Sequence, residues 1–236
     1  MSFVVPDAPA AARPDGPAGA PERDRGTTLV RFDLAERVAH WANALLFLAL
    51  VATALPLYFP SVEAAVGRRA LVAEIHTWCG VALPFPLLVS LAGPWGARMR
   101  RDVRRINRWS AEEVAWLRTF GTRAVARTDK FNPGQKLNAA FTAGAIVVML
   151  ASGSVLRWFG PFPLSFRTGA TFVHDVLAAA IVATISAHVL LALAHPASLR
   201  SMVTGRITTS WAQRHAPAWL DEALGRAAAS HGEGGS

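Results

Sequence analysis

Four long apolar blocks constrain the fold of this 236-residue chain more than any other feature. A helix needs about 20 residues to cross the ~30 Å hydrocarbon core of a bilayer. The blocks are apolar on all sides, whereas each helix of a soluble bundle carries one apolar stripe. We therefore predict an all-α membrane protein, a four-transmembrane-helix bundle with spans at 38–59, 71–93, 137–156 and 170–194.

The distribution of basic residues predicts the orientation of these spans. Of the 24 Lys and Arg residues, 20 fall in the N-terminal tail, the 94–136 connection and the C-terminal tail. Cytoplasmic loops of membrane proteins carry such an excess. We therefore predict that both termini are cytoplasmic and that the chain lies in the cytoplasmic (inner) membrane. The net charge of +8 then indicates contact with membrane lipid and no nucleic-acid partner.

The two ends of the chain differ in composition from the spans. Residues 1–30 are rich in Ala, Pro, Gly, Asp and Arg, which predicts a disordered N-terminal tail. Residues 220–236 are expected to form a mostly disordered C-terminal tail. The membrane domain is predicted to occupy 31–219.

The long connection between spans two and three contains a helix signal. Ser110 and Glu113 have the spacing of a capping box, in which each side chain binds the other residue's free amide. An apolar stripe follows. We predict an amphipathic cytoplasmic helix near 111–126 that lies on the membrane surface.

Four histidines lie inside the predicted spans, and a histidine within a bilayer usually marks a functional site. With the N-terminus inside, His40 and His188 fall near the cytoplasmic face, and His76 and His174 fall near the outer face. His174 and His188 are 14 residues apart, which is roughly 21 Å along a helix and close to four turns. Both therefore lie on one face of span four.

Two histidine pairs at two depths predict two haem b groups. Neutral imidazole binds iron without placing a charge in an apolar interior. The inner haem would have His40 and His188 as axial ligands, and the outer haem would have His76 and His174. Such six-coordinate sites have no open position, so they carry electrons and do not bind oxygen. His195, seven residues beyond His188 on the same face, is an alternative inner ligand.

Cations near the ends of the spans are candidates to meet the haem propionates, because an unpaired buried charge is costly. Arg37 lies one turn from His40 and is expected to serve the inner haem. Arg157 or Arg167 is expected to serve the outer haem.

These histidines belong to longer stretches that resemble a known family. Over about 31–219, the chain resembles the cytochrome b (gamma) subunit of membrane-bound respiratory formate dehydrogenases. The histidine pattern alone is shared with cytochrome b subunits of hydrogenases, and the Asn-x-Gly-Gln-Lys stretch is more specific. The matching stretches are Arg37-Val-Ala-His40-Trp41, Ile75-His76-Thr-Trp-Cys-Gly80, Phe131-Asn-Pro-Gly-Gln-Lys136, the two span-four histidines, and Ser201-Met-Val-Thr-Gly-Arg206 with Trp211 and Trp219.

The resemblance implies a membrane anchor for an iron–sulfur (beta) subunit and a molybdenum or tungsten catalytic (alpha) subunit. Formate would be oxidised on the catalytic subunit. Electrons would pass from the outer to the inner haem and reduce menaquinone at the cytoplasmic side. The quinone pocket of the family maps onto Asn132, Gly134, Gln135 and His188.

The residues themselves allow two interpretations of this pocket. The amides of Asn132 and Gln135 can donate to a quinone carbonyl, and Gly134 lets backbone approach a ligand. Alternatively, Asn132 and Pro133 are the N-cap and first residue of a helix. Both interpretations can hold together.

Two other functions compete with a formate dehydrogenase subunit. One is the cytochrome b subunit of a hydrogenase or another quinone-linked oxidoreductase. The other is a haem-free membrane scaffold or transporter, in which the histidines bind a metal or protons. A reduced absorption spectrum would separate them, because a cytochrome b subunit shows sharp b-type bands and a haem-free scaffold or transporter shows none.

Overall fold

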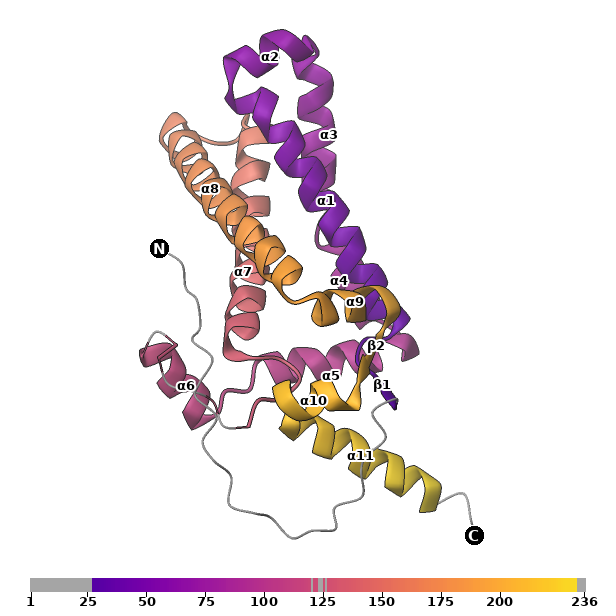
Figure 1. Ribbon diagram of the computed structural model, residues 1–236. Helices are drawn as coiled ribbons and strands as arrows, with labels where there is room; N and C mark the ends of the chain where they lie inside the picture. The colour runs from indigo at the N-terminus through magenta and orange to yellow at the C-terminus, as the bar shows by residue number, and fades with distance from the viewer. Residues whose placement is uncertain (1–26, 120, 123–124, 126, 233–236) are drawn as a thin grey trace.

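Residues 27–119, 121–122, 125 and 127–232 are described by a computed structural model (Figure 1). It contains four segments that are long and apolar enough to cross a membrane. Few of their side chains are buried within the chain, as expected for helices that face lipid. The prediction of four spans is confirmed. They are α1 (Leu34–Tyr58), α3 (Arg69–Ala82) continued by α4 (Phe85–Leu91), α7 (Pro133–Arg157) and α8 (Leu164–Ala194).

The first span begins four residues earlier than predicted, because its first turn is polar and capped. Asp33 Oδ1 accepts from the backbone amide of Glu36 at 2.9 Å, and Glu36 Oε2 accepts from the amide of Asp33 at 2.7 Å. This capping box satisfies amides that would otherwise lack a partner. The fourth span also begins early, at Leu164, because Arg167 in its first turn interrupts the apolar pattern.

The spans pack as two pairs, α1 with α3 and α7 with α8, and α3 also contacts α7 (Figure 1). The helix of span two is interrupted between α3 and α4, at a segment that contains Pro84. Proline has no amide hydrogen and breaks the helical hydrogen-bond pattern. The short helix α2 (Pro60–Val66) joins α1 to α3 at the end of the bundle farthest from both described chain ends.

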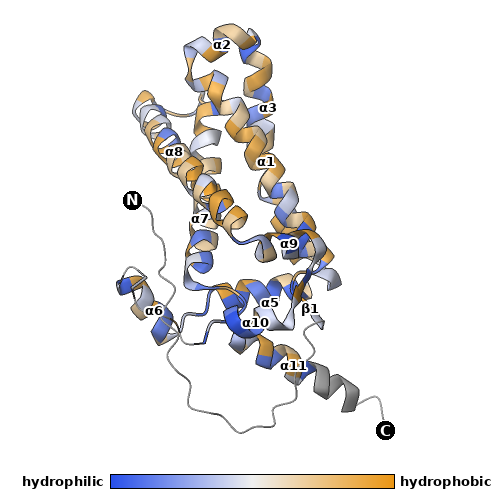
Figure 2. Cartoon of the chain, in the orientation of Figure 1, coloured by the Kyte–Doolittle hydropathy of each residue, from blue (hydrophilic) through white to orange (hydrophobic). Residues whose placement is uncertain are grey.

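The opposite end of the bundle carries a polar layer of short elements, which we call the base. Figure 2 shows blue, hydrophilic residues concentrated there and orange, hydrophobic residues along the spans. An apolar cluster that includes Ile207, Trp219 and Leu220 holds it together. The base consists of the 3₁₀ helix η1 (Pro94–Gly96), α5 (Ala97–Ile106), α6 (Ala111–Arg118), α9 (Pro196–Thr204), α10 (Thr209–His215), α11 (Pro217–Gly232), and strands β1 (Thr28–Val30) and β2 (Arg206–Thr208).

A two-stranded antiparallel sheet joins the N-terminal and C-terminal parts of the base. Leu29 of β1 pairs with Ile207 of β2. The predicted disordered tail reached residue 30, but residues 28–30 form β1, so the prediction is wrong for these three residues. Residues 1–26 lie outside the described residues.

Two further expectations about the base need correction. The capping box of Ser110 and Glu113 is confirmed, but α6 ends at Arg118, well before residue 126. Gly121, at φ 83°, has a left-handed backbone that a continuing helix cannot accommodate.

The expected C-terminal disorder does not hold for 220–232, because these residues belong to α11. Its burial on the base explains the order, since Leu220 is only 4 % exposed.

Candidate functional site

The four span histidines meet in two pairs that share α8. The ring of His188 lies 6.3 Å from the ring of His40 on α1, measured between centroids. The ring of His174 lies 6.4 Å from the ring of His76 on α3. The structure therefore brings together the same histidines that their depths in the membrane paired in the sequence.

The spacing within each pair fits a metal held between two imidazoles. Imidazole nitrogen binds divalent metals at about 2.0–2.1 Å. One metal between two facing rings then separates their centroids by roughly 6 Å. Direct hydrogen bonding would bring ring nitrogens to about 2.9 Å and the rings closer together. The two observed separations are therefore suited to an ion with one imidazole on each side.

Two hydroxyl groups orient the rings of the outer pair. Nδ1 of His76 lies 2.9 Å from Oγ1 of Thr53, which itself donates to the carbonyl of Ala49 at 2.7 Å. Nδ1 of His174 lies 3.0 Å from Oγ of Ser152. Because each hydroxyl gives its proton to its own helix backbone, each Nδ1–H donates to the hydroxyl oxygen. Nε2 of each ring is then left to bind a metal.

The Ser152 hydroxyl donates to Val148 of its own helix at 2.8 Å, as the Thr53 hydroxyl donates within α1. The outer pair thus has the same arrangement on both sides. For the inner pair, no residue in the described part of the chain hydrogen-bonds to the ring of His40 or His188. The two histidine pairs therefore differ in their surroundings.

The inner pair lies beside a junction between α1 and α9. Trp41 Nε1 donates to the carbonyl of Met202 at 3.1 Å, and its ring contacts His40 edge-on. Arg37 donates from Nε to the carbonyl of Asp33 at 3.3 Å and from Nη1 to the carbonyl of Val203. These contacts fix the first turns of α1 against the base. Arg37 thus lies at the end of the bundle that meets the base, and its hydrogen-bond partners are backbone carbonyls.

The two outer arginines flank the far end of the bundle. Arg157 closes α7 and pairs with Glu74 of α3 at 2.7 Å, and both side chains are about half exposed. Arg167 in the first turn of α8 lies over the ring of Phe159 at 4.7 Å. The Arg157 side chain can reorient at little cost, because exposed ion pairs contribute little stability.

The other histidines lie outside the two pairs. His195 follows the last residue of α8 and places Nδ1 2.8 Å from the carbonyl of Leu191. It is exposed beside Pro196, which begins α9. His215 stacks on Trp211 in α10. The structure thus pairs His188 with His40 and leaves His195 at the end of the helix.

The predicted quinone residues begin α7. Asn132 Oδ1 accepts from the amide of Gln135 at 2.9 Å, and Gln135 Oε1 accepts from the amide of Asn132 at 3.0 Å. The helix-cap interpretation is therefore confirmed. Both side chains are exposed, and their NH₂ groups have no acceptor among the described residues. A Cβ on Gly134 would make only ordinary contacts with the chain, so the fold alone does not require glycine there.

Sequence reasoning missed two buried lysines that position these elements. Lys136, only 3 % exposed, donates to Glu113 Oε1 at 2.6 Å and to the carbonyl of Arg108 at 2.8 Å. It therefore fixes the start of α7 against α6. Lys130 is buried between Asp102 and Glu36. The signal available in the sequence was a few acidic residues, among them Asp102 and Glu113, in segments that are otherwise rich in arginine. Such carboxylates indicate buried ion pairs.

Each histidine pair offers too few protein ligands for a metal site that is built from side chains alone. Among the described residues, no group of three or more His, Cys, Asp or Glu side chains could hold a metal. A structural zinc site needs about four protein ligands. Two facing imidazoles suffice only where another group supplies the remaining ligands, and a porphyrin does so.

Residues 31–205 match the family described as prokaryotic cytochrome b561. The chain belongs to this family. A cytochrome b561 binds haem b, which is the cofactor that the two imidazole pairs suit. The matched residues include all four paired histidines and the Asn132–Lys136 stretch. The four apolar spans make this cytochrome b561 a multi-pass membrane protein.

Several relatives of this cytochrome b561 have names that refer to formate dehydrogenase. The cytochrome b556(fdo) subunit of Escherichia coli K12 formate dehydrogenase is 28% identical over 210 residues, which is 84% of this chain and 94% of the relative. The cytochrome b556 subunit of Haemophilus influenzae formate dehydrogenase is 24% identical over 209 residues, 85% of this chain and 86% of the relative. The cytochrome b556(Fdn) subunit of the nitrate-inducible E. coli K12 enzyme is 22% identical over 206 residues, 82% of this chain and 91% of the relative.

Proposed function

We propose that this chain is the membrane anchor and diheme cytochrome b subunit of a formate dehydrogenase complex. Its partners are an iron–sulfur (beta) subunit and a molybdenum or tungsten catalytic (alpha) subunit, where formate is oxidised. The chain carries electrons from the iron–sulfur subunit past the outer histidine pair, then past the inner pair, to menaquinone. The names of the relatives support the choice of formate dehydrogenase.

One observation carries the diheme part of this proposal. Two imidazole pairs, 6.3 and 6.4 Å apart, lie at two positions along α8, separated by 14 residues or roughly 21 Å of helix. Haem b, when bound, supplies a reversible one-electron carrier. The role of the protein is to hold two such carriers at different depths, with His40 and His188 at one and His76 and His174 at the other.

The distribution of basic residues supports an orientation of the chain in the membrane, and with it the direction of electron transfer. The arginine-rich base lies at the end of the bundle where α1 begins and α8 ends (Figure 1). His40 is near the start of α1 and His188 is near the end of α8, so this pair is close to the base. The positive-inside rule assigns that end, and therefore both termini and helix α6, to the cytoplasmic side of the inner membrane. His76 and His174 are then on the outer side, where electrons enter from the partner subunits.

Arginines near each pair are proposed to meet the haem propionates. At the inner end Arg37 is held beside α1 by backbone carbonyls. At the outer end Arg157 or Arg167 has an exposed or weakly held side chain that can turn toward a carboxylate. Each would supply the positive charge that a buried propionate needs.

Menaquinone is proposed to bind at the start of α7. The NH₂ groups of Asn132 and Gln135 are donors not used by the capping box, and Gly134 has no side chain to keep a ring away from the backbone. His188 completes the pocket from α8. Reduction of a quinone takes two electrons and two protons, and the cytoplasmic position lets the protons come from that side.

Purification of the chain with its native partners tests the proposed complex. We expect an iron–sulfur subunit and a molybdenum- or tungsten-containing subunit to copurify. Formate should then reduce the b-type absorption bands, and a menaquinone analogue should reoxidise them. Bands that are reduced by hydrogen and not by formate would assign the chain to a hydrogenase and contradict the proposal.

A further inference from the structure

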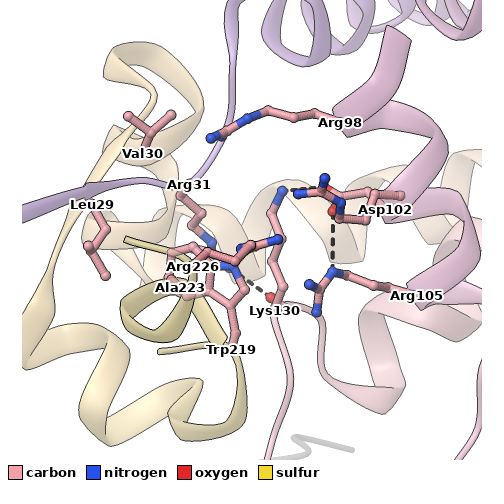
Figure 3. Close-up of a pocket in the computed structure, with 11 residues that line it drawn as sticks. Leu29, Val30, Arg31, Arg98, Asp102, Arg105, Lys130, Trp219, Ala223 and Arg226 are labelled. Carbon is pink, nitrogen blue, oxygen red and sulfur yellow. Dashed lines mark hydrogen bonds and ion pairs between the residues drawn. The ribbon is translucent and has the colours of Figure 1, made fainter. Parts of the chain in front are cut away.

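The base contains a cavity whose walls are mainly cationic. It has a volume of about 400 Å³ and lies between β1, α5 and α11. Figure 3 shows basic side chains from α5, from α11, from the residue that follows β1 and from Lys130 around the same space. Asp102 is the one acidic residue of the lining. The basic lining residues are Arg31, Arg98, Arg101, Arg105, Lys130 and Arg226.

Half of these cations are neutralised by nearby carboxylates. Lys130 pairs with Asp102 and with Glu36 at 3.4 Å. Arg105 pairs with Asp129 at 2.6 Å and with Glu222. Hydrogen bonds and ion pairs with these two carboxylates outweigh the effect of burial and raise the pKa of Arg105.

Arg226 shares Glu222 with Arg105, at 3.0 Å. The remaining three, Arg31, Arg98 and Arg101, form no ion pair with any residue that the structure describes. The cavity therefore carries more positive charge than its carboxylates balance.

Arg31 is the most strongly buried of the unpaired arginines. Its side chain is held by the hydroxyls of Ser198 and Ser201, at 3.4 and 3.3 Å, and by the carbonyl of Lys130 at 3.5 Å. Its guanidinium also lies 4.4 Å from the ring centroid of Trp211. None of these groups is an anion.

The nitrogen Nε of Arg31 is buried and has no hydrogen-bond partner among the described residues, although the residue is only 3 % exposed. Burial lowers the pKa of Arg31 to about 10, and the nearby charge of Asp102 offsets this only in part. A buried guanidinium is stabilised when its N–H groups meet an anion. Nε of Arg31 is therefore a donor that a bound anion could satisfy.

We propose that this cavity binds a phosphate group. The planar fork of a guanidinium matches phosphate oxygens, and several arginines that converge on one space are the usual way to hold such a group. The cavity volume exceeds that of one phosphate, so the rest of a headgroup can also enter. The ligand is either the headgroup of an anionic phospholipid or free phosphate.

The position of α5 makes both sources accessible. It follows the end of span two after only the short helix η1, and Arg100 donates to the carbonyls of Leu91 and Gly93 at 2.7 and 2.9 Å. The cavity therefore lies next to the end of a span. Basic pockets in this position on the cytoplasmic side bind anionic lipid headgroups. The cavity shares no residue with the histidine pairs, so this site does not depend on the proposed redox function.

Arg98→Gln and Arg101→Gln in the full chain, purified with its partners, test this site. Both residues are exposed on α5 and line the cavity. Arg104→Gln is the matched control, because Arg104 is exposed on the same helix and outside the lining. One probe is phosphatidylglycerol in nanodiscs, with phosphatidylcholine as reference and bound lipid counted by native mass spectrometry. The other is inorganic phosphate at constant ionic strength, with thermal stabilisation as the measurement.

We expect each lining variant to bind the effective probe roughly tenfold more weakly, the loss of one charge-assisted hydrogen bond. Arg104→Gln should bind as the wild type does. Retention of phosphatidylglycerol alone would identify a lipid headgroup, and stabilisation by phosphate alone would identify a free anion. Lining variants that bind both probes as tightly as wild type would overturn the proposal, as would an equal loss in Arg104→Gln. Unchanged b-type absorption would establish that the variants fold.

Discussion

The hydroxyl of Thr53 accepts a hydrogen bond from Nδ1 of His76 at 2.9 Å while it donates to the backbone of its own helix. Ser152 makes the same arrangement with His174 at 3.0 Å. The tautomer and the orientation of both rings are therefore set before a metal binds. A ligand imidazole that donates from its second nitrogen is also a better electron donor to its metal.

Loss of these hydroxyls is expected to affect only the outer haem. Thr53→Val preserves the shape of the side chain and removes the acceptor for His76. The affinity for the outer haem should fall roughly tenfold or more, and its midpoint potential should rise, because the ferric state loses electron density from the ligand. Redox titration of the absorption bands measures the potential, and titration of the haem-depleted protein with haem measures the affinity.

Thr184→Val is a matched control, because the Thr184 hydroxyl donates to the carbonyl of Ala180 in the same way and has no hydrogen bond to a paired histidine among the described residues. A potential that moves equally in Thr184→Val and Thr53→Val, or in neither, would show that the hydroxyl of Thr53 does not tune the ligand.

Substitution of the histidines should separate the two haems. His76→Ala and His174→Ala should both lose the outer haem and leave the same residual spectrum. His40→Ala and His188→Ala should both lose the inner haem and share a second residual spectrum. His195→Ala should keep both haems, since His195 lies at the end of α8. Loss of a haem in His195→Ala with both haems retained in His188→Ala would mean that the inner ligand is misassigned.

Two conservative substitutions separate quinone binding from helix capping. Gln135→Glu and Asn132→Asp retain the oxygen that closes the capping box and remove the NH₂ donor. Each lost hydrogen bond is worth about 1 kcal/mol, so quinone should bind roughly fivefold more weakly and haem reoxidation by a menaquinone analogue should slow. Stopped-flow absorption measures this step.

Reduction of both haems by the electron donor should not change in these variants, which is the internal control. Reoxidation at the wild-type rate in both variants would place the quinone elsewhere and leave the Asn132–Lys136 stretch as a helix cap alone.

The ion pair between Lys136 and Glu113 should contribute strongly to stability. Lys136→Met leaves the Glu113 carboxylate buried without its cation, a change that costs about 3–5 kcal/mol. The unfolding temperature should fall, and adding Glu113→Gln should restore part of it. Arg69→Met is the comparison, because Arg69 pairs with Glu63 at an exposed position where little loss is expected. Equal melting of Lys136→Met and Arg69→Met would contradict this role.

Local features of the sequence were sufficient for the spans, the helix caps and the histidine pairs. Hydropathy locates a membrane helix because every side of it faces an apolar environment. The caps at Ser110 and Asn132 depend on residues only three positions apart. The histidine pairs followed from depth, because the alternation of span direction fixes the level of each residue.

The base could not be predicted in the same way, because its contacts join distant segments. Arg105 pairs with Glu222, a residue 117 positions away, and β1 pairs with β2 across the whole membrane domain. No periodicity marks such pairs. Helix α5 was not predicted, because it has few apolar residues among its arginines and therefore shows no clear apolar stripe. Helix α11 was not predicted, because burial on the base stabilises it and its sequence carries no strong helix signal.

The haem content of the purified chain tests the central claim most directly. Two imidazole pairs spaced for one metal each predict two haem b groups per chain. A pyridine haemochrome assay, with protein quantified by amino-acid analysis, measures this ratio. We expect a value close to two, which falls to about one in His76→Ala and in His40→Ala. A wild-type value near one or zero would contradict it.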